Sequence, residues 1–374
     1  MAIVVGVPSR IVLFGATGYT GRLTAAALRD AGAEPVLAGR NRASLEILAE
    51  ELGGRLQTRV ADVSDPASVR ALVEPGDVLI STVGPFARWG APAVEAALDG
   101  GAAAYMDSTG EPPFIRRVFE DWGPPAARAG VPLLTALGYD WAPGNLAGAL
   151  AADEAGPAAR RIEIGYFVTG SGMGGMSGGT RASTAGVMLE PGFAFRGGRI
   201  VTEPAGRHVA SFAVRGKDRQ AVSVGSSEHF TLPALDPALT DVDVYLGWFG
   251  AMSRPMQVGS IGLAAIGRIG PLKRGLAGLT HRLVKGSTGG PTEAERADGG
   301  SWIVARAYDG DGGRLAEVTL AGVDGYSFTG RFLAWAATRA AEAPITGSGA
   351  LGPASAFGLA EFERGVATAG IERA

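Results

Sequence analysis

Three glycines follow an apolar run near the start of the chain. The segment reads Ile11-Val-Leu-Phe-Gly-Ala-Thr-Gly-Tyr-Thr-Gly21. In such a segment the first glycine permits a tight turn, the second lets the backbone approach a pyrophosphate, and the third lets a helix pack closely on the strand. A dinucleotide pyrophosphate would then rest on free N–H groups at the helix start, although an ordinary glycine-rich turn has the same pattern. The predicted cofactor contacts are Gly15, Thr17, Gly18, Tyr19, Thr20 and Gly21.

The end of the second apolar run bears on the choice of dinucleotide. An NAD site normally places an acidic residue there, but this chain reads Leu37-Ala-Gly-Arg-Asn-Arg42. The guanidinium of Arg40, with Arg42 beside it, suits the 2′-phosphate of NADP, and a solvated arginine at a strand end is the alternative. We therefore predict NADP as the cofactor. By position, the adenine is expected at Asp62, and the nicotinamide at Val83, Gly84, Pro85 and Phe86.

Hydride transfer from a nicotinamide requires the protein to orient the substrate and to supply a proton. Tyr139 is a candidate proton donor, and Asp140 is a candidate contact to the substrate or to the nicotinamide amide. A core tyrosine and an aspartate that caps a helix are the structural alternatives. Thr180 opens a further expected helix and could hold a substrate carbonyl or carboxylate. Glu111 precedes two prolines and is expected to be a helix-start carboxylate.

Composition excludes several kinds of chemistry. The chain of 374 residues has no cysteine, which rules out disulfides, iron–sulfur clusters and a cysteine nucleophile. Its three histidines form no His-x-x-x-His pair, so no metal site is predicted. The net charge of −3 argues against nucleic acid as a partner. The start of the chain does not resemble a signal peptide, and we expect a cytoplasmic protein.

The pattern of apolar runs predicts the elements that must position these residues. Short apolar runs alternate with helix-like segments over the first 135 residues, which is typical of an α/β fold with a Rossmann doubly wound parallel sheet. We predict this domain for residues 1–140 and a second, α+β domain on a mostly antiparallel sheet for 141–349. A C-terminal helix within 350–374 is expected to pack back on the first domain. The predicted strands of the first domain are 10–15, 34–38, 56–61, 77–83, 103–107 and 131–134.

One segment of the second domain, 244–292, contains no acidic residue but several basic ones. It is either a mobile excursion over the domain or a basic, apolar lid that meets an acyl chain, a carrier protein or a membrane surface. A homodimer is a further expectation.

Several motifs together resemble the saccharopine dehydrogenase-like oxidoreductases, a family that includes trans-acting enoyl reductases. The resemblance covers roughly Gly15 to Thr180. It implies NADPH and hydride transfer to a C=C or C=N bond of a small or acyl substrate, in secondary or lipid metabolism. Enoyl reductase relatives commonly read Pro-Ser-Asp where this chain has Pro143-Gly-Asn145. The matching segments are Gly15–Gly21, Ala38–Arg40, Thr82–Phe86, Tyr105–Glu111, Gly138–Asn145 and Ser177–Thr180.

Two other functions are alternatives. A short-chain dehydrogenase needs a Tyr-x-x-x-Lys pair, but the residues four positions before the three lysines are Ala213, Ile269 and His281. That chemistry is therefore excluded. A non-catalytic NADP-binding sensor, or a scaffold associated with membrane or lipid, stays open as the alternative.

Overall fold

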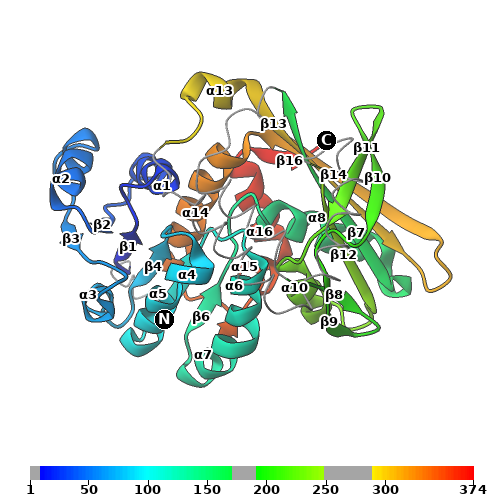
Figure 1. Ribbon diagram of the computed structural model, residues 1–374, viewed down its shortest axis with the longest axis horizontal. Coiled ribbons are helices and arrows are strands. Elements are labelled where there is room, and N and C mark those ends of the chain that lie inside the picture. Colours follow the sequence, from blue (N-terminus) through cyan, green and yellow to red (C-terminus); the bar gives the residue numbers. More distant parts are fainter. Residues whose placement is uncertain (1–8, 171–190, 248–288) are drawn as a thin grey trace, which may run out of the picture.

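A computed structural model of the protein describes residues 9–170, 191–247 and 289–374, which build two sheets (Figure 1). The strands of the first sheet are β1 (Ile11–Phe14), β2 (Val36–Gly39), β3 (Thr58–Val60), β4 (Val78–Ser81), β5 (Ala104–Asp107), β6 (Pro132–Leu134) and β15 (Gly349–Ala350). They are parallel, in the order β15-β6-β5-β4-β1-β2-β3. The order 3-2-1-4-5-6 within it is that of a Rossmann fold, and it confirms the predicted fold class.

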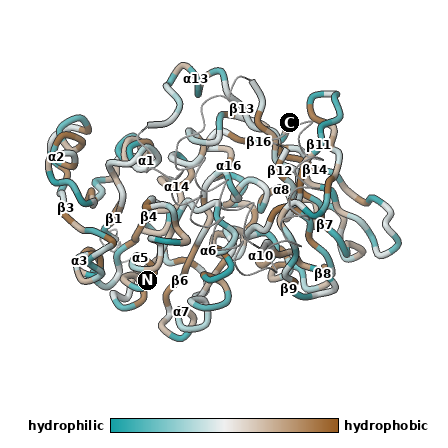
Figure 2. Tube along the Cα trace, in the orientation of Figure 1, coloured by the Kyte–Doolittle hydropathy of each residue, from teal (hydrophilic) through white to brown (hydrophobic). Residues whose placement is uncertain are grey.

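Helices cover both faces of this sheet, which explains why its central strands are apolar without alternation. Every residue of β1, β2, β4 and β5 is buried. Figure 2 shows hydrophobic residues along strands such as β6. The helices of this half are α1 (Tyr19–Asp30), α2 (Arg42–Glu51), α3 (Pro66–Arg70), α4 (Phe86–Trp89), α5 (Ala91–Gly100), α6 (Pro112–Arg117) and α7 (Gly123–Ala129), with a π-helical turn, Val118–Trp122, between the last two.

The second sheet has nine strands within the described residues. They are β7 (Arg161–Gly170), β8 (Pro191–Arg196), β9 (Arg199–Pro204), β10 (Val209–Val214), β11 (Lys217–Ser223), β12 (Asp241–Leu246), β13 (Gly299–Tyr308), β14 (Arg314–Val323) and β16 (Ile371–Arg373). All their pairings are antiparallel except that of β12 with β7, so the predicted, mostly antiparallel sheet is confirmed. Helix α8 (Ala142–Ala155) packs on β7, β13 and β14. Short helices α10 (Glu228–Leu235) and α13 (Glu293–Asp298) complete this half.

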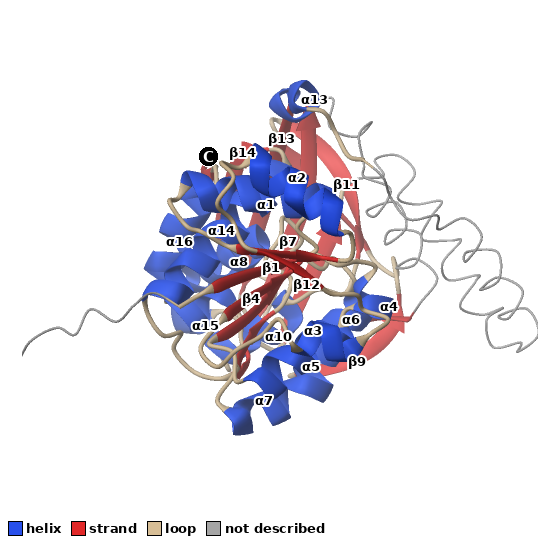
Figure 3. Cartoon of the chain, turned by 90° about the vertical axis from the view of Figure 1, so that its left-hand side faces the viewer, coloured by secondary structure: helices blue, strands red, loops and turns tan. Residues whose placement is uncertain are grey.

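The end of the chain contributes to both sheets. Helix α14 (Gly325–Glu342) packs against α1 and against β1, β4 and β5, although the sequence assigned 329–342 to the second domain. Figure 3 shows α14 beside α1 at the first sheet. An apolar stripe predicts that a helix is buried but not which sheet buries it, which explains the difference. Helices α15 (Pro353–Phe357) and α16 (Leu359–Thr368) follow, and α16 packs on α8 and α14. No helix among the described residues is long and apolar enough to cross a bilayer.

Candidate functional site

The glycine turn after β1 has the geometry that its spacing predicts. Gly15 adopts φ +90°, and a Cβ there would lie 2.7 Å from Thr82 Oγ1. A Cβ at Gly21 would lie 2.2 Å from the Gly15 carbonyl oxygen, so only glycine fits either position. Gly18 caps α1 without a side-chain hydrogen bond, and the first turn of α1 holds no acidic residue. The N–H groups of that turn and the positive end of the helix dipole therefore suit an anion such as a diphosphate.

The side chain of Tyr19 is engaged by the later part of the chain. Its hydroxyl donates to the Pro291 carbonyl and accepts from Arg296 Nη1 at 2.9 Å. The edge of the Tyr326 ring packs on it at 5.1 Å between centroids, and a Cβ at Gly290 would lie 2.6 Å from the Tyr19 ring. In Figure 1 the chain before α13 descends to α1 at this point. The Tyr19 side chain thus joins α1 to the segment before β13, and only its backbone is left for a cofactor.

Arg40 follows β2 and is exposed. Within the described chain, nothing forms a hydrogen bond or ion pair with its guanidinium. Arg42 is also exposed and begins α2, which Asn41 caps by accepting the Ser44 N–H at 3.0 Å. An arginine without a partner at the carboxyl end of β2 is positioned to bind a phosphate.

Asp62 lies at the end of β3, as predicted, but its carboxylate is used locally. The Ser64 N–H and hydroxyl donate to Asp62 Oδ1 at 2.8 and 2.7 Å. These hydrogen bonds lower the pKa of Asp62, and the charge of Arg40 lowers it further. The side chain therefore stabilises its own turn.

The segment after β4 is partly consumed by contacts within the protein. The Glu111 carboxylate accepts the N–H groups of Phe86 and Ala87 at 2.8 and 2.9 Å, so it caps α4 rather than the helix that follows it in sequence. The Phe86 ring is buried against Phe114, at 5.5 Å between centroids. Phe86 therefore has neither its ring nor its N–H free for a cofactor, which differs from the prediction. Of the residues predicted to contact the nicotinamide, 83–85 are those that these contacts leave free to do so.

Asp107 ends β5 and ties it to the chain after β6. It is fully buried, and its carboxylate accepts from the Thr109 N–H at 2.9 Å, the Ala136 N–H at 3.0 Å and the Thr135 hydroxyl at 2.8 Å. Burial raises the pKa of Asp107 to about 6, and these hydrogen bonds oppose the rise. Asp107 thereby fixes the backbone at Ala136, four residues before another acidic residue, Asp140.

That residue, Asp140, has no such partners. Its Oδ1 is buried and forms no hydrogen bond with any residue the structure describes. Its Oδ2 lies beside Gly110, where a Cβ would be 3.1 Å away. Burial raises the pKa of Asp140 to about 7. Near neutral pH the carboxyl can therefore hold or release a proton, as a general acid must.

Tyr139 is a core residue. Its hydroxyl donates to the Phe167 carbonyl at 3.1 Å, and its ring meets the Tyr166 ring edge-on at 5.7 Å. Burial raises the pKa of Tyr139. The structure therefore favours the core alternative over the proton donor that the sequence suggested. Thr180, and all of 244–292 except its two ends, lie outside the described residues.

Sequence reasoning missed a buried polar cluster behind Asp140. Tyr166 of β7 and Glu228 of α10 meet the turn at Trp141, and Gly144 makes room for them. A Cβ at Gly144 would lie 2.0 Å from the Tyr166 hydroxyl, which explains why this chain has glycine there. Asn145 Nδ2 donates to the Trp141 carbonyl at 3.0 Å and to Ser227 Oγ at 2.9 Å. The sequence feature that could have indicated this cluster is Glu228, an acidic residue at the start of the largely apolar segment 228–235. Across the described ranges, no three metal-binding side chains come together.

Comparisons with known proteins identify the family and support the fold. A family model described as NAD(P)H-binding matches residues 15–110. A Mycobacterium tuberculosis protein that bears the provisional name of trans-acting enoyl reductase is 31% identical over 420 residues, covering 95% of this chain and 94% of its own. The chain belongs to the trans-acting enoyl reductase family. The trans-acting enoyl reductase of Mycobacterium leprae is 38% identical over 141 residues, 36% of this chain and 34% of its own.

Two solved structures resemble the protein in fold over nearly its whole chain. Saccharopine dehydrogenase of Saccharomyces cerevisiae has a TM-score of 0.56 at 14% identity, over 96% of both chains. Homospermidine synthase of Legionella pneumophila, solved with NAD, has a TM-score of 0.60 at 10% identity, over 98% of this chain and 91% of its own. The predicted resemblance to saccharopine dehydrogenase-like oxidoreductases is confirmed, and the protein is an NAD(P)-binding oxidoreductase.

Proposed function

We propose that the protein is an NADP(H)-dependent reductase that adds hydrogen across a C=C or C=N bond, with Asp140 as the proton donor. The observation that carries this proposal is the half-buried Asp140 at the carboxyl edge of the Rossmann sheet, whose Oδ1 is buried and forms no hydrogen bond with any described residue. Burying a carboxyl oxygen without a hydrogen bond lowers the stability of the fold, and groups of this kind are common at functional sites.

The order of residues along that edge supports the proposal. Arg40 follows β2, Gly15 follows β1, residues 83–85 follow β4, Gly110 follows β5 and Asp140 follows the chain out of β6. Neighbouring strands lie roughly 4.8 Å apart, so an extended dinucleotide spans several of them. With the 2′-phosphate at Arg40 and the diphosphate on α1, a nicotinamide would reach the ends of β4 and β5. A substrate stacked on it would then meet Asp140.

The reaction divides between cofactor and protein. A bound nicotinamide would supply a hydride to one atom of the substrate double bond. Asp140 donates its proton to the other atom, so the product is saturated and Asp140 is left as a carboxylate. A proton from water restores the acid. Burial of Oδ1 keeps the proton affinity of the Asp140 carboxyl high.

The proposed reaction is compatible with more than one class of substrate. A small molecule and an acyl chain both fit the proposal, and contact of 244–292 with lipid or a carrier protein belongs to the acyl version. The cytoplasmic location and the homodimer stay predictions.

Cofactor titration tests the proposal. We expect Arg40→Ala to weaken NADPH binding by about 1.5–3 kcal/mol, roughly 10- to 150-fold, because a charge-assisted contact to the 2′-phosphate is lost. NADH binding should not change. Binding is followed by fluorescence of the reduced nicotinamide, with Arg128→Ala, an exposed arginine of α7, as the matched control.

Equal losses for the two cofactors would mean that Arg40 does not contact the 2′-phosphate. NADPH consumption with a panel of imines and enoyl thioesters then tests the reaction. Tight NADPH binding without turnover of any of them would favour the non-catalytic sensor.

A further inference from the structure

The loop after β5, residues 107–111, contains buried hydrogen bonds to which the proposed reaction assigns no role. Asp107 and Thr109 are fully buried, and the Asp107 carboxylate accepts the Thr109 N–H at 2.9 Å. The Thr109 hydroxyl in turn accepts the Glu111 N–H at 3.1 Å. These bonds join the first residue of the loop to the last, so the loop is held as one piece.

One end of this loop holds the segment after β4. The Glu111 carboxylate accepts the N–H groups of Phe86 and Ala87 at 2.8 and 2.9 Å. These two residues directly follow 83–85, where we expect the nicotinamide to bind. The position of that segment is therefore tied to the loop.

The other end of the loop holds the turn that carries Asp140. Asp107 Oδ1 accepts the Ala136 N–H at 3.0 Å, and Asp107 Oδ2 accepts the Thr135 hydroxyl at 2.8 Å. The backbone carbonyl of Asp107 accepts the Leu137 N–H at 2.8 Å. Three consecutive residues, 135–137, are thus bound to one aspartate.

The backbone of Ala136 shows what these bonds do for the turn. Its φ is +62°, a left-handed conformation that residues with a Cβ rarely adopt. Such a conformation persists only where the surrounding structure holds it, and it is common at functional sites. The Ala136 carbonyl accepts the Trp141 N–H at 3.1 Å, which closes the turn around Asp140. The placement of Asp140 therefore depends on a strained residue that Asp107 holds.

The Asp140 side chain also returns to the same loop. Its Oδ2 lies beside Gly110, where a Cβ would be 3.1 Å from that oxygen. Gly110 stands between Thr109, which is bound to Asp107, and Glu111, which is bound to the segment after β4. The loop thus contacts the Asp140 carboxyl directly and also holds the turn from which it projects.

We propose that Asp107 is a positioning residue that holds the Asp140 carboxyl in place relative to the segment after β4. The inference rests on the proposed role of Asp140 as the proton donor. Asp107 acts as a hydrogen-bond acceptor and transfers no proton to the substrate. Hydride and proton must reach neighbouring atoms of one double bond, and a shift of about 1 Å in a catalytic group can slow turnover by about 100-fold.

A double-mutant cycle tests this inference. Asp107→Ala removes the side-chain acceptor, and we expect kcat per NADPH-binding site to fall about 10- to 100-fold while NADPH affinity is unchanged. In an Asp140→Asn background the same substitution should cause no further loss, because a residue that acts only through Asp140 then has nothing to position. Sites are counted by fluorescence titration with NADPH, so unfolded protein does not enter kcat.

Two further variants separate the hydrogen bonds from the charge. Asp107→Asn is the conservative one, because its Oδ1 can still accept the N–H groups of Thr109 and Ala136 while its Nδ2 donates to the Thr135 hydroxyl. It should restore kcat to near the wild-type level. Thr135→Val removes a single hydrogen bond and replaces Asp107→Ala in the cycle should that variant not fold. We expect from it a smaller loss of kcat, again absent in the Asp140→Asn background.

Asp77→Ala is the matched control. Asp77 is a buried aspartate at the opposite edge of the same sheet, where it accepts Arg10 Nε at 3.0 Å and the Glu74 N–H at 2.8 Å. Its loss should lower stability but leave kcat per NADPH-binding site unchanged.

Equal losses from Asp107→Ala in the wild-type and Asp140→Asn backgrounds would overturn the inference. So would a loss in Asp77→Ala as large as that in Asp107→Ala. An Asp107→Asn variant as slow as Asp107→Ala would also overturn it, because Asp107 would then act through its charge or its proton. Failure of the proposed function would instead appear as absent NADPH binding, absent turnover in the wild type, or full activity in Asp140→Asn, so the two failures are distinguishable.

Discussion

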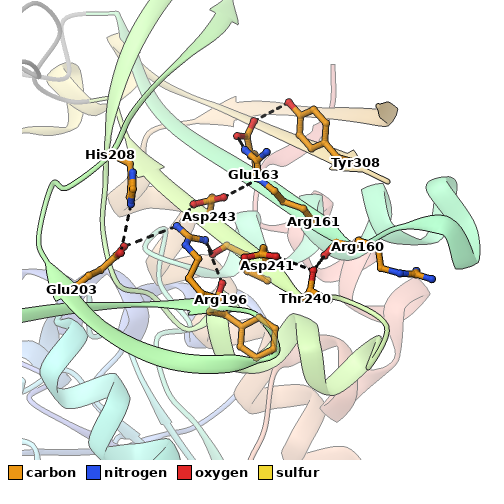
Figure 4. Close-up of polar contacts among 12 residues, drawn as sticks. Arg160, Arg161, Glu163, Arg196, Glu203, His208, Thr240, Asp241, Asp243 and Tyr308 are labelled. Atoms are coloured by element: carbon orange, nitrogen blue, oxygen red, sulfur yellow. Dashed lines mark hydrogen bonds and ion pairs between the residues drawn. The ribbon is translucent and has the colours of Figure 1, made fainter. Parts of the chain in front are cut away.

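Two sets of carboxylates, one on each side of the second sheet, differ in their partners. On the first face, Asp243 accepts Arg161 Nε at 3.1 Å and also contacts Arg196, while Glu163 binds Arg161 and accepts the Tyr308 hydroxyl at 2.8 Å (Figure 4). On the face toward α8 lie Tyr166 and its partner Glu228. Asp140, in the turn after β6, adds its charge to the surroundings of Tyr166. The alternation of side chains along β7 sends Glu163 and Tyr166 to these two faces.

The difference separates ionised acids that stabilise the fold from acids that can be protonated near neutral pH. Arginines stabilise the charge of Asp243 and Glu163, so these carboxylates act as fixed anions that join β7, β8 and β12. Asp140 and Glu228 have no arginine within the described structure, and burial brings the pKa of each to about 7. A site that must exchange protons near neutral pH needs acids of the second kind.

The largest effect is expected at Asp140. Asp140→Asn keeps the shape of the side chain but removes the proton that the reaction needs, so kcat should fall by about 10²- to 10⁴-fold. NADPH affinity should be unchanged, because the diphosphate and the 2′-phosphate are held at α1 and β2. Stopped-flow oxidation of NADPH with the best substrate of the panel measures the loss. Activity near the wild-type level would remove Asp140 from the reaction.

A smaller effect is expected from Glu228 on stability against pH. Its pKa in the folded state, about 7, lies above the ordinary glutamate value, so its favourable contribution is complete below about pH 4.5 and is lost as the pH rises through 7. The loss is about 3 kcal/mol for a shift of this size. Glu228→Gln should therefore match the wild type at pH 5 and gain stability over it by pH 8, as measured by urea unfolding. A constant difference across this range would contradict the raised pKa.

The sequence was sufficient for the Rossmann half because its signals are local. Each of the six predicted strands overlaps one of β1–β6, and Gly15 and Gly21 are required by contacts within a few residues or with the adjacent strand. The turn and the helix start therefore followed from one segment. The direction of a side chain was harder to predict. Phe86 was placed by position, yet Glu111 and Phe114, more than 20 residues away, turn its N–H and ring into the core.

The contact between Tyr166 and Glu228 could not be predicted from the sequence for the same reason. Tyr166 and Glu228 are separated by 62 residues and meet only when α10 packs beside α8. Nothing in either local pattern shows that they meet or that cations are absent around them. Likewise, the local pattern predicts Tyr19 as a cofactor residue but does not show that its side chain contacts Arg296, 277 residues away. Long-range packing decides which polar residues are compensated, and that information is spread over both halves of the chain.

The smallest effect completes the comparison from the other face. Asp243→Asn removes the anion between Arg161 and Arg196, and breaking a fully buried pair would cost about 3–5 kcal/mol. These arginine side chains are 38% and 26% exposed, so water relieves part of the cost, and we expect a loss of about 2 kcal/mol in the free energy of unfolding. Turnover of folded protein at pH 7 should stay at the wild-type level, in contrast to Asp140→Asn. Urea unfolding and steady-state kinetics on one preparation measure both quantities. A large loss of kcat with unchanged stability would show that the paired acids also serve the reaction, and the division between the two faces would fail.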